Sequence, residues 1–128
     1  MNTNANPIQT AEQISSILGA ISPAPRLAIL LAIGGGEACV CHLEAVLGKR
    51  QAYISQNLMA LRQAEILLDR REGRFIYYRI ANPALLDLIH DAGRLAGVEI
   101  TSPVSAVMCE CPHCAEKQPG YVALSSVV

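Results

Sequence analysis

Residues 37–80 decide the fold of this chain, and they read EACVCHLEAVLGKRQAYISQNLMALRQAEILLDRREGRFIYYRI. The first part predicts a short helix over residues 39–47, because Gly48 readily takes the left-handed conformation on which helices end. A second helix is predicted over residues 51–64, where Ile54, Leu58 and Leu61 form one apolar stripe at i, i+4 and i+7. Two helices joined by a short turn that contains glycine are typical of a helix-turn-helix motif.

Two strand-like segments follow the motif. They cover residues 67–71 and 75–80, and Glu72, Gly73 and Arg74 lie between them. Short apolar runs separated by a turn with glycine predict a β-hairpin. A helix-turn-helix followed by a hairpin with a basic tip indicates a winged helix, an arrangement that points to duplex DNA.

Further helices are predicted on both sides of this stretch. Residues 10–20 carry apolar side chains at helical spacing, and a helix that begins near Pro23 or Pro25 and runs to Ile33 is apolar on most faces, hence central. A last helix over residues 84–96 has more apolar surface than a terminal helix on a small core requires. The expected fold is therefore mainly α with a β-hairpin wing, in the order α-α-α-α-β-β-α.

Length and composition suit one domain with one modest core, since the chain has 128 residues, of which 52% are hydrophobic and 16% charged. We expect a disordered N-terminus over residues 1–9, the winged-helix domain over residues 10–97, and a flexible tail over residues 98–128. No apolar run approaches the roughly 20 residues that a membrane span needs. The N-terminus lacks the basic and apolar regions of a secretory signal, so we expect a cytoplasmic protein with no membrane partner.

The charges are distributed unevenly along the chain. Residues 49–79 hold seven of the ten basic residues against three acidic ones, a net charge of +4, while the remainder holds three basic and eight acidic residues, a net charge of −5. Such an asymmetry supplies the local positive charge that phosphate contacts need, although an ordinary solvated hairpin would carry similar charges.

Specific side chains follow from this placement. The N-terminal part of the second helix of the motif would enter the major groove, and the basic residues would contact phosphates or the minor groove. The predicted groove residues are Gln51, Tyr53, Ser55 and Gln56, and the predicted basic contacts are Lys49, Arg50, Arg71 and Arg74.

Cys39 and Cys41 stand two residues apart at the start of the motif. On a regular helix their side chains would point about 200° apart, whereas in an extended or helix-entry segment residues i and i+2 face the same side. We therefore expect Cys39 just before or at the helix start and Cys41 in the first turn, where the helix dipole favours the thiolate. Two small buried side chains that only pack are the alternative.

A second cysteine cluster, CECPHC, occupies residues 109–114. Three thiols in a tail with no core to fill suit a thiophilic ion such as Zn(II), Cd(II), Pb(II) or As(III), and the tail is long enough to reach the first pair in its own subunit or across a dimer. No organic cofactor is expected. The predicted ligands are Cys39, Cys41, Cys109, Cys111 and Cys114.

The segments EACVCHL, LGKRQAYISQNLMALRQAEIL and RREGRFIYYRI together resemble the ArsR/SmtB family of bacterial metal-sensing repressors, over residues 11–96. The resemblance implies a winged-helix homodimer, formed through the first and last helices, that leaves its operator DNA when an effector binds. Family members with a Cys-x-Cys site often complete it with N-terminal cysteines. This N-terminus has none, which leaves the C-terminal cluster as the replacement. Glu65 stands where the family commonly has a glycine that ends the recognition helix.

Other functions remain open at this point. The chain lacks a phosphate loop, a Gly-x-Ser-x-Gly segment and a His-Glu-x-x-His segment, so we expect no enzyme. The CPHC segment would suit a thiol oxidoreductase only within a thioredoxin-like context, which its flanks do not supply. A repressor of the same fold that uses its five cysteines as a redox or persulfide switch is the alternative to an ion sensor.

Overall fold

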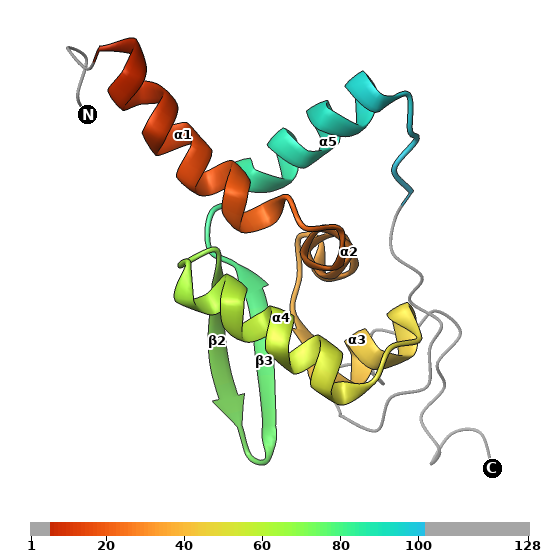
Figure 1. Cartoon of the computed structure of the whole chain (residues 1–128). Coiled ribbons are helices and arrows are strands. Elements are labelled where there is room, and N and C mark those ends of the chain that lie inside the picture. Colours follow the sequence, from red (N-terminus) through yellow and green to blue (C-terminus); the bar gives the residue numbers. More distant parts are fainter. Residues whose placement is uncertain (1–5, 102–128) are drawn as a thin grey trace.

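The computed structural model describes residues 6–101, and its elements follow one another as in Figure 1. Seven of the eight elements match those expected from the sequence, and the additional one is a two-residue strand. The elements are α1 (Pro7–Ile21), α2 (Ala24–Ile33), β1 (Ala38–Cys39), α3 (Val40–Leu47), α4 (Gln51–Gln63), β2 (Leu67–Glu72), β3 (Phe75–Ile80) and α5 (Ala84–Ala96).

Helix α1 begins earlier than residue 10 because Asn6 caps it. The Asn6 side chain accepts a hydrogen bond from the Gln9 backbone N–H at 2.8 Å, and the Gln9 side chain accepts one from the Asn6 backbone N–H at 3.3 Å. This reciprocal capping box satisfies two backbone donors at the helix end. The helix thus begins within the segment 1–9 that was expected to be disordered, and residues 1–5 lie outside the described part of the chain.

The core surrounds α2, which is seen end-on in Figure 1 and contacts α1, α3, α4 and β3. Its Ile29 and Leu30 are fully buried, as are Ile54 and Leu61 on the predicted stripe of α4. A helix that is apolar on most faces needs neighbours on every side. The central position predicted for α2 is confirmed.

Strand β1 was not expected from the sequence. It pairs antiparallel with β3, in the register Ala38↔Tyr78 and Cys39↔Tyr77, and gives a three-stranded sheet in the order β1-β3-β2. Two residues are too few to show a period of two, which is the usual signal of a strand. The strand places the first cysteine on the edge of the sheet that forms the wing.

The two faces of this sheet carry different clusters. On one face Ala38, Leu67 and Ile80 join the main core, and on the other Cys39 and Tyr77 form a small separate cluster. Alternate residues of a strand point to opposite faces, which is why neighbours in sequence belong to different clusters. The cysteine-bearing cluster therefore packs on the wing and apart from the helical core.

The ends of α3 and α4 fix the angle of the motif. Gly48 ends α3 with φ 65°, as predicted. Helix α4 ends in the same left-handed conformation at Glu65, with φ 62°, where the Glu65 N–H bonds the Arg62 carbonyl and the Ile66 N–H bonds the Leu61 carbonyl. This is a Schellman motif built on a residue other than glycine.

The chain after α5 turns back onto that helix. The Val98 N–H donates to the Gly93 carbonyl at 2.9 Å, and the Ile100 side chain sits so close to Gly93 that a Cβ there would lie 2.7 Å from Ile100 Cδ1. The packed domain therefore extends past residue 97, up to Ile100. The cysteine cluster at residues 109–114 lies outside the described residues.

Among residues 6–101, no single helix is long and apolar enough to cross a membrane. Helices α1 and α2 reach the necessary length only as a pair, and they bend by 78° at the break between them.

Candidate DNA-binding surface and thiol site

The outward face of α4 is polar at its N-terminal end. Gln51 and Gln56 are exposed, while Tyr53 and Ser55 are partly buried. Tyr53 is held in place, because the Lys49 ammonium lies 5.4 Å from its ring centroid and the Asn57 side chain donates to its carbonyl at 2.8 Å. The two glutamines are the most accessible of the predicted groove residues.

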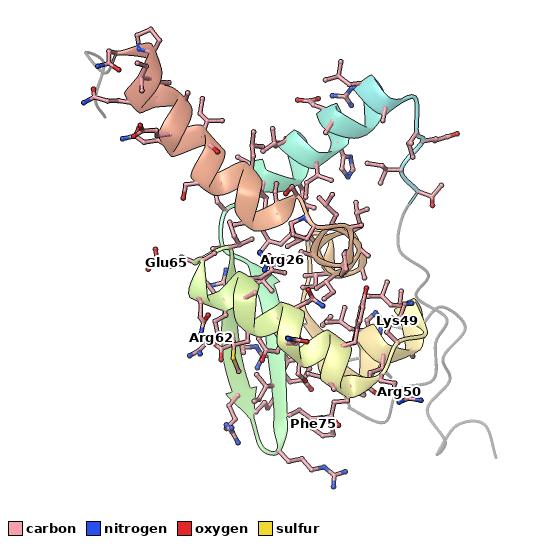
Figure 2. The ribbon with its side chains drawn as sticks, viewed as in Figure 1. Arg26, Lys49, Arg50, Arg62, Glu65 and Phe75 are labelled. Carbon is pink, nitrogen blue, oxygen red and sulfur yellow. The ribbon has the colours of Figure 1, made fainter. Side chains whose placement is uncertain are left out.

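Six of the seven basic residues between positions 49 and 79 divide into two groups. Arg62 is paired with Asp69 at 3.1 Å, and Arg70 is paired with Glu37 and Glu72. Figure 2 shows Lys49 and Arg50 at the turn between α3 and α4, and Phe75 near the tip of the hairpin, where Arg74 lies over its ring at 5.2 Å. In the described part of the chain, no ion pair engages the predicted phosphate contacts Lys49, Arg50, Arg71 and Arg74.

Cys39 and Cys41 lie as the spacing predicts. Cys39 is the extended residue that precedes α3, with φ −89° and ψ 169°, and Cys41 lies in the first helical turn. Their sulfur atoms point to the same side and are 2.9 Å apart. Both cysteines thus lie at the N-terminal end of α3.

The thiol pair has aromatic and buried surroundings. Cys39 is only 2% exposed, and it packs with Tyr77, Phe75 and the partly buried Cys41. The Phe75 and Tyr77 rings are 6.5 Å apart between centroids. An apolar wall of this kind excludes water from one side of the sulfur atoms.

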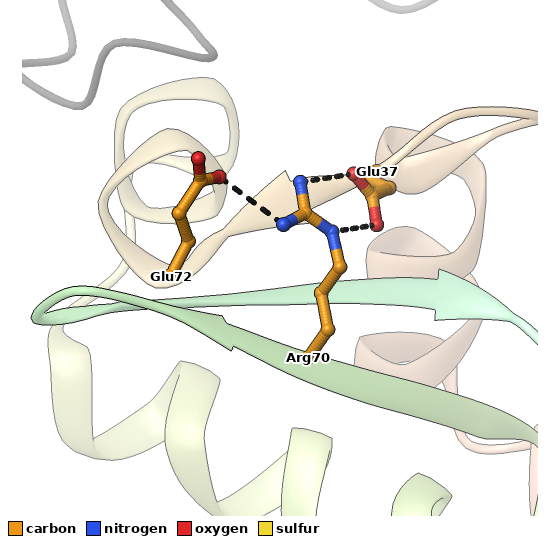
Figure 3. A network of polar contacts seen from close by, with 3 residues as sticks. All are labelled: Glu37, Arg70 and Glu72. Atoms are coloured by element: carbon orange, nitrogen blue, oxygen red, sulfur yellow. Dashed lines mark hydrogen bonds and ion pairs between the residues drawn. The ribbon is translucent and has the colours of Figure 1, made fainter.

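A network of charged side chains lies beside the pair (Figure 3). Arg70 Nε and Nη2 donate to the two carboxylate oxygens of Glu37 at 2.7 and 2.8 Å, and Nη1 donates to Glu72 at 3.1 Å. These bonds raise the pKa of Arg70, with the bond to Glu37 as the largest cause, so the guanidinium keeps its charge. Planar bidentate pairing fixes direction as well as distance.

The sequence did not indicate the roles of Glu37, Arg70 and Tyr77. Arg70 and Glu37 are 33 residues apart, and only the pairing of β1 with β3 brings them together. The one available signal was the charge of Arg70, which placed it in the basic region without showing that a carboxylate holds it.

The described residues supply only part of an ion site. Within residues 6–101, no group of three or more His, Cys, Asp or Glu side chains is arranged to hold a metal ion. Two thiolates on one side suit a thiophilic ion, but soft ions in proteins take three or four ligands. Cys109, Cys111 and Cys114, the other predicted ligands, lie outside the described residues.

Helices α1 and α5 share an apolar groove of about 560 Å³. It is lined by residues that include Leu18, Leu27 and Leu88, and Leu95 on the same last helix is 91% exposed. Contiguous apolar surface of this kind commonly marks an interaction site.

The chain is similar to known regulatory proteins over this same region. The model of the family described as "Bacterial regulatory protein, arsR family" matches residues 25–67. The arsenic resistance transcriptional regulator ArsR2 of Pseudomonas putida is 45% identical over 64 residues, which cover 50% of this chain and 55% of that protein. The chain thus spans about half the length of the arsenic regulators that it matches, including the arsenical resistance operon repressor of Escherichia coli, of which it covers 49% at 42% identity.

A longer match and the solved structures extend the similarity to the whole domain. The biofilm growth-associated repressor of Agrobacterium fabrum is 37% identical over 79 residues, which cover 62% of this chain and 68% of that protein. The structure of NolR from Sinorhizobium fredii covers 77% of this chain and 100% of its own, with a TM-score of 0.64 and 25% identity. The structure of the transcriptional repressor BigR from Xylella fastidiosa covers 69% of this chain and 90% of its own, with a TM-score of 0.64 and 27% identity. The chain therefore belongs to the ArsR/SmtB family of winged-helix transcriptional regulators, which are not enzymes.

Proposed function

We propose that this protein is a dimeric repressor that leaves its operator DNA when a thiophilic ion binds Cys39 and Cys41. The observation that carries the proposal is the position of the two sulfur atoms, which are 2.9 Å apart at the start of α3. Helix α3 packs against α4, the helix that would enter the major groove. A ligand that moves the start of α3 therefore acts close to the DNA-reading helix.

The DNA contacts divide into base and phosphate contacts. Gln51, Tyr53, Ser55 and Gln56 would face base edges, and the exposed glutamines can make the bidentate bonds that Gln forms with adenine. The phosphate contacts would be Lys49, Arg50, Arg71 and Arg74. Operator DNA places the protein in the cytoplasm.

The second subunit would cover the groove between α1 and α5. Its apolar lining and the exposed Ile14, Ile17 and Leu95 suit a second copy of the same surface, since most homo-oligomers form such two-fold contacts. A two-fold dimer would present two copies of α4 about one DNA turn apart, which fits a palindromic operator.

The remaining ligands would come from Cys109, Cys111 and Cys114. Thr101 lines a hollow together with Gly34 and Gly35, which are only a few residues before Cys39. Thr101 and Cys109 are eight positions apart in the chain and can therefore lie at most about 26–29 Å apart. The position of Thr101 near Gly34 and Gly35 favours ligands from the same subunit over ligands from across the dimer.

The ion that we propose first is As(III), because three of the similar proteins are named for arsenic resistance. Cd(II), Pb(II) and Zn(II) are the alternatives that a set of thiolates allows. A redox or persulfide switch is the second candidate function. A polysulfide could oxidise the two thiols, whose sulfur atoms are 2.9 Å apart, to a disulfide, and would itself be reduced to hydrogen sulfide.

One titration separates these functions. Operator affinity of the full chain is measured with arsenite, Cd(II), Pb(II), Zn(II) and a polysulfide, beside thiolate charge-transfer absorbance. We expect an ion to lower the affinity, and the absorbance to fall in the Cys39→Ser/Cys41→Ser variant and in a chain cut before Cys109. Release by polysulfide alone would favour the redox function, and release by none of them would contradict both.

A further inference from the structure

One row of side chains crosses the wing sheet and includes the buried thiol. Cys39 on β1 stands opposite Tyr77 on β3, and Tyr77 stands opposite Arg70 on β2. Residues directly opposite one another on neighbouring strands project on the same face. The thiol, the ring and the guanidinium therefore lie side by side on the face that carries the small cluster.

Arg70 reaches across this row to the far edge of the sheet. Its guanidinium lies 4.6 Å above the centroid of the Tyr77 ring and ends on Glu37 with two hydrogen bonds of 2.7 and 2.8 Å (Figure 3). Glu37 precedes β1 and is two residues from Cys39. The backbone pairing with β3 and the ion pair with β2 thus both hold the thiol-bearing segment on the wing.

Ion binding should strain this arrangement. A tetrahedral Zn(II) bonded to two thiolates at about 2.3 Å places the sulfur atoms about 3.8 Å apart. A pyramidal As(III) would hold them closer than that, but still farther apart than the 2.9 Å found here. Cys39 is 2% exposed and packs on Tyr77, and Cys41 packs on the same small cluster. A sulfur that moves outward therefore pushes on the wing or pulls on β1.

We propose that Glu37 and Arg70 are positioning residues that transmit ion binding at the thiol pair to the wing. The proposal rests on the function proposed above and assigns Arg70 to this role instead of to phosphate binding. The Glu37–Arg70 pair converts a shift of β1 into a shift of β2, and the turn that carries Arg74 follows β2 directly. Without the pair, only the backbone pairing with β3 couples β1 to the wing, so ion binding should displace the wing less.

The test compares operator release in variants that keep their shape. Glu37→Gln and Arg70→Gln remove one partner each from an ion pair on the surface, where such pairs contribute little to stability. Asp69→Asn is the matched control, because it removes the Arg62–Asp69 pair from the adjacent position on β2 without touching β1. The operator dissociation constant is measured with and without arsenite, and with Cd(II) where arsenite does not act.

The release ratio is the operator dissociation constant with the ion divided by the one without it. We expect this ratio to fall by about 2- to 30-fold in Glu37→Gln and Arg70→Gln. The double variant should match the single ones, because residues that act as a pair are not additive. Ion affinity, followed by thiolate absorbance without DNA, should change less than the release ratio, and Asp69→Asn should release DNA as the wild type does. In Glu37→Gln the released Arg70 guanidinium could bind a DNA phosphate and so change the release ratio, whereas Arg70→Gln has no guanidinium at this position. An equal effect in both variants would therefore exclude a new phosphate contact of Arg70 as the cause.

The outcomes distinguish this inference from the proposed function. If the wild type releases DNA and Glu37→Gln releases it equally well, only the transmitting role is wrong. A loss of release in Asp69→Asn as large as in Glu37→Gln would mean that any charge change on β2 has this effect, and would also overturn it. If no ion releases the wild type, the proposed function fails and the transmitting role fails with it.

Discussion

At the residue scale, Glu65 has a backbone conformation that is unfavourable for a residue other than glycine. It is the only non-glycine residue with positive φ among those described, and it ends α4 with φ 62°. The left-handed conformation costs an L-residue about 1–2 kcal/mol, and the negative charge of Glu65 at a helix C-terminus adds a smaller cost. The hydrogen bonds of Glu65 and Ile66 to the last turn of α4 hold the residue there.

We therefore expect Glu65→Gly to stabilise the fold by about 1 kcal/mol, since glycine relieves the strain and loses part of the gain to its greater freedom when unfolded. Urea denaturation of both proteins measures the difference. Glu65→Ala is the control, because alanine keeps the strain and removes only the charge. Equal stability of the glycine and alanine variants would show that the backbone of Glu65 is not strained.

Also at this scale, Gln56 and Arg74 should differ in how they affect DNA binding. Gln56 is exposed on α4 and would contact a base, whereas Arg74 at the wing tip would contact the backbone. We expect Gln56→Ala to cost about 1–3 kcal/mol on the operator and to relax the preference at one base pair. Arg74→Ala should weaken all sequences alike and reduce the salt dependence. Gel shifts with operator and unrelated DNA at several salt concentrations check both, and unchanged operator affinity in both variants would contradict the docking.

At the element scale, the helices and the hairpin were predictable because the apolar residues of each element recur at a regular spacing. Ile54, Leu58 and Leu61 are all buried, and the wing strands begin and end within a residue of the expected positions. The positions of Cys39 and Cys41 were also predictable, because only a helix entry lets residues i and i+2 share a side.

The interactions between distant residues were not predictable in this way. Strand β1 has two residues and therefore no period, and the start of α1 depends on the particular capping pair Asn6 and Gln9. The bond between Glu37 and Arg70 depends on the register of β1 on β3, which a sequence without pairing information does not specify. The missed features are thus those set by single contacts instead of by repeated patterns.

The apolar groove of α1 and α5 gives a prediction for these two helices. Leu88 is 40% exposed on α5 and lines the groove, so Leu88→Asp would place an unpaired charge in the proposed subunit contact. We expect this variant to be monomeric in sedimentation at micromolar concentration and to lose operator binding. Leu68→Asp is the control, since Leu68 is similarly exposed, at 42%, but lies on β2. A monomeric wild type, or a dimeric Leu88→Asp variant, would show that the groove has another role.

At the scale of the whole molecule, the proposed ion site and the proposed DNA surface belong to one connected unit. Cys39 lies on the wing sheet through β1, and Cys41 lies in α3, which contacts α4. Both DNA-contacting elements therefore meet at the thiol pair. On the proposed function, an ion bound at this position would have two ways to disfavour DNA binding, through the angle of α4 and through the wing.

An equilibrium switch of this kind must be reciprocal. If the ion weakens operator binding by a given factor, operator DNA must weaken ion binding by the same factor, typically about 5- to 150-fold. We expect thiolate absorbance titrations of the dimer, with and without saturating operator, to give dissociation constants for the ion whose ratio equals the release ratio. Unrelated DNA at high salt, where it does not bind, serves as the control. An ion affinity that operator leaves unchanged, beside clear release by the ion, would mean that release is not a binding equilibrium. Oxidation of the thiols to a disulfide would then be the better explanation, and a reductant should restore DNA binding where a chelator does not.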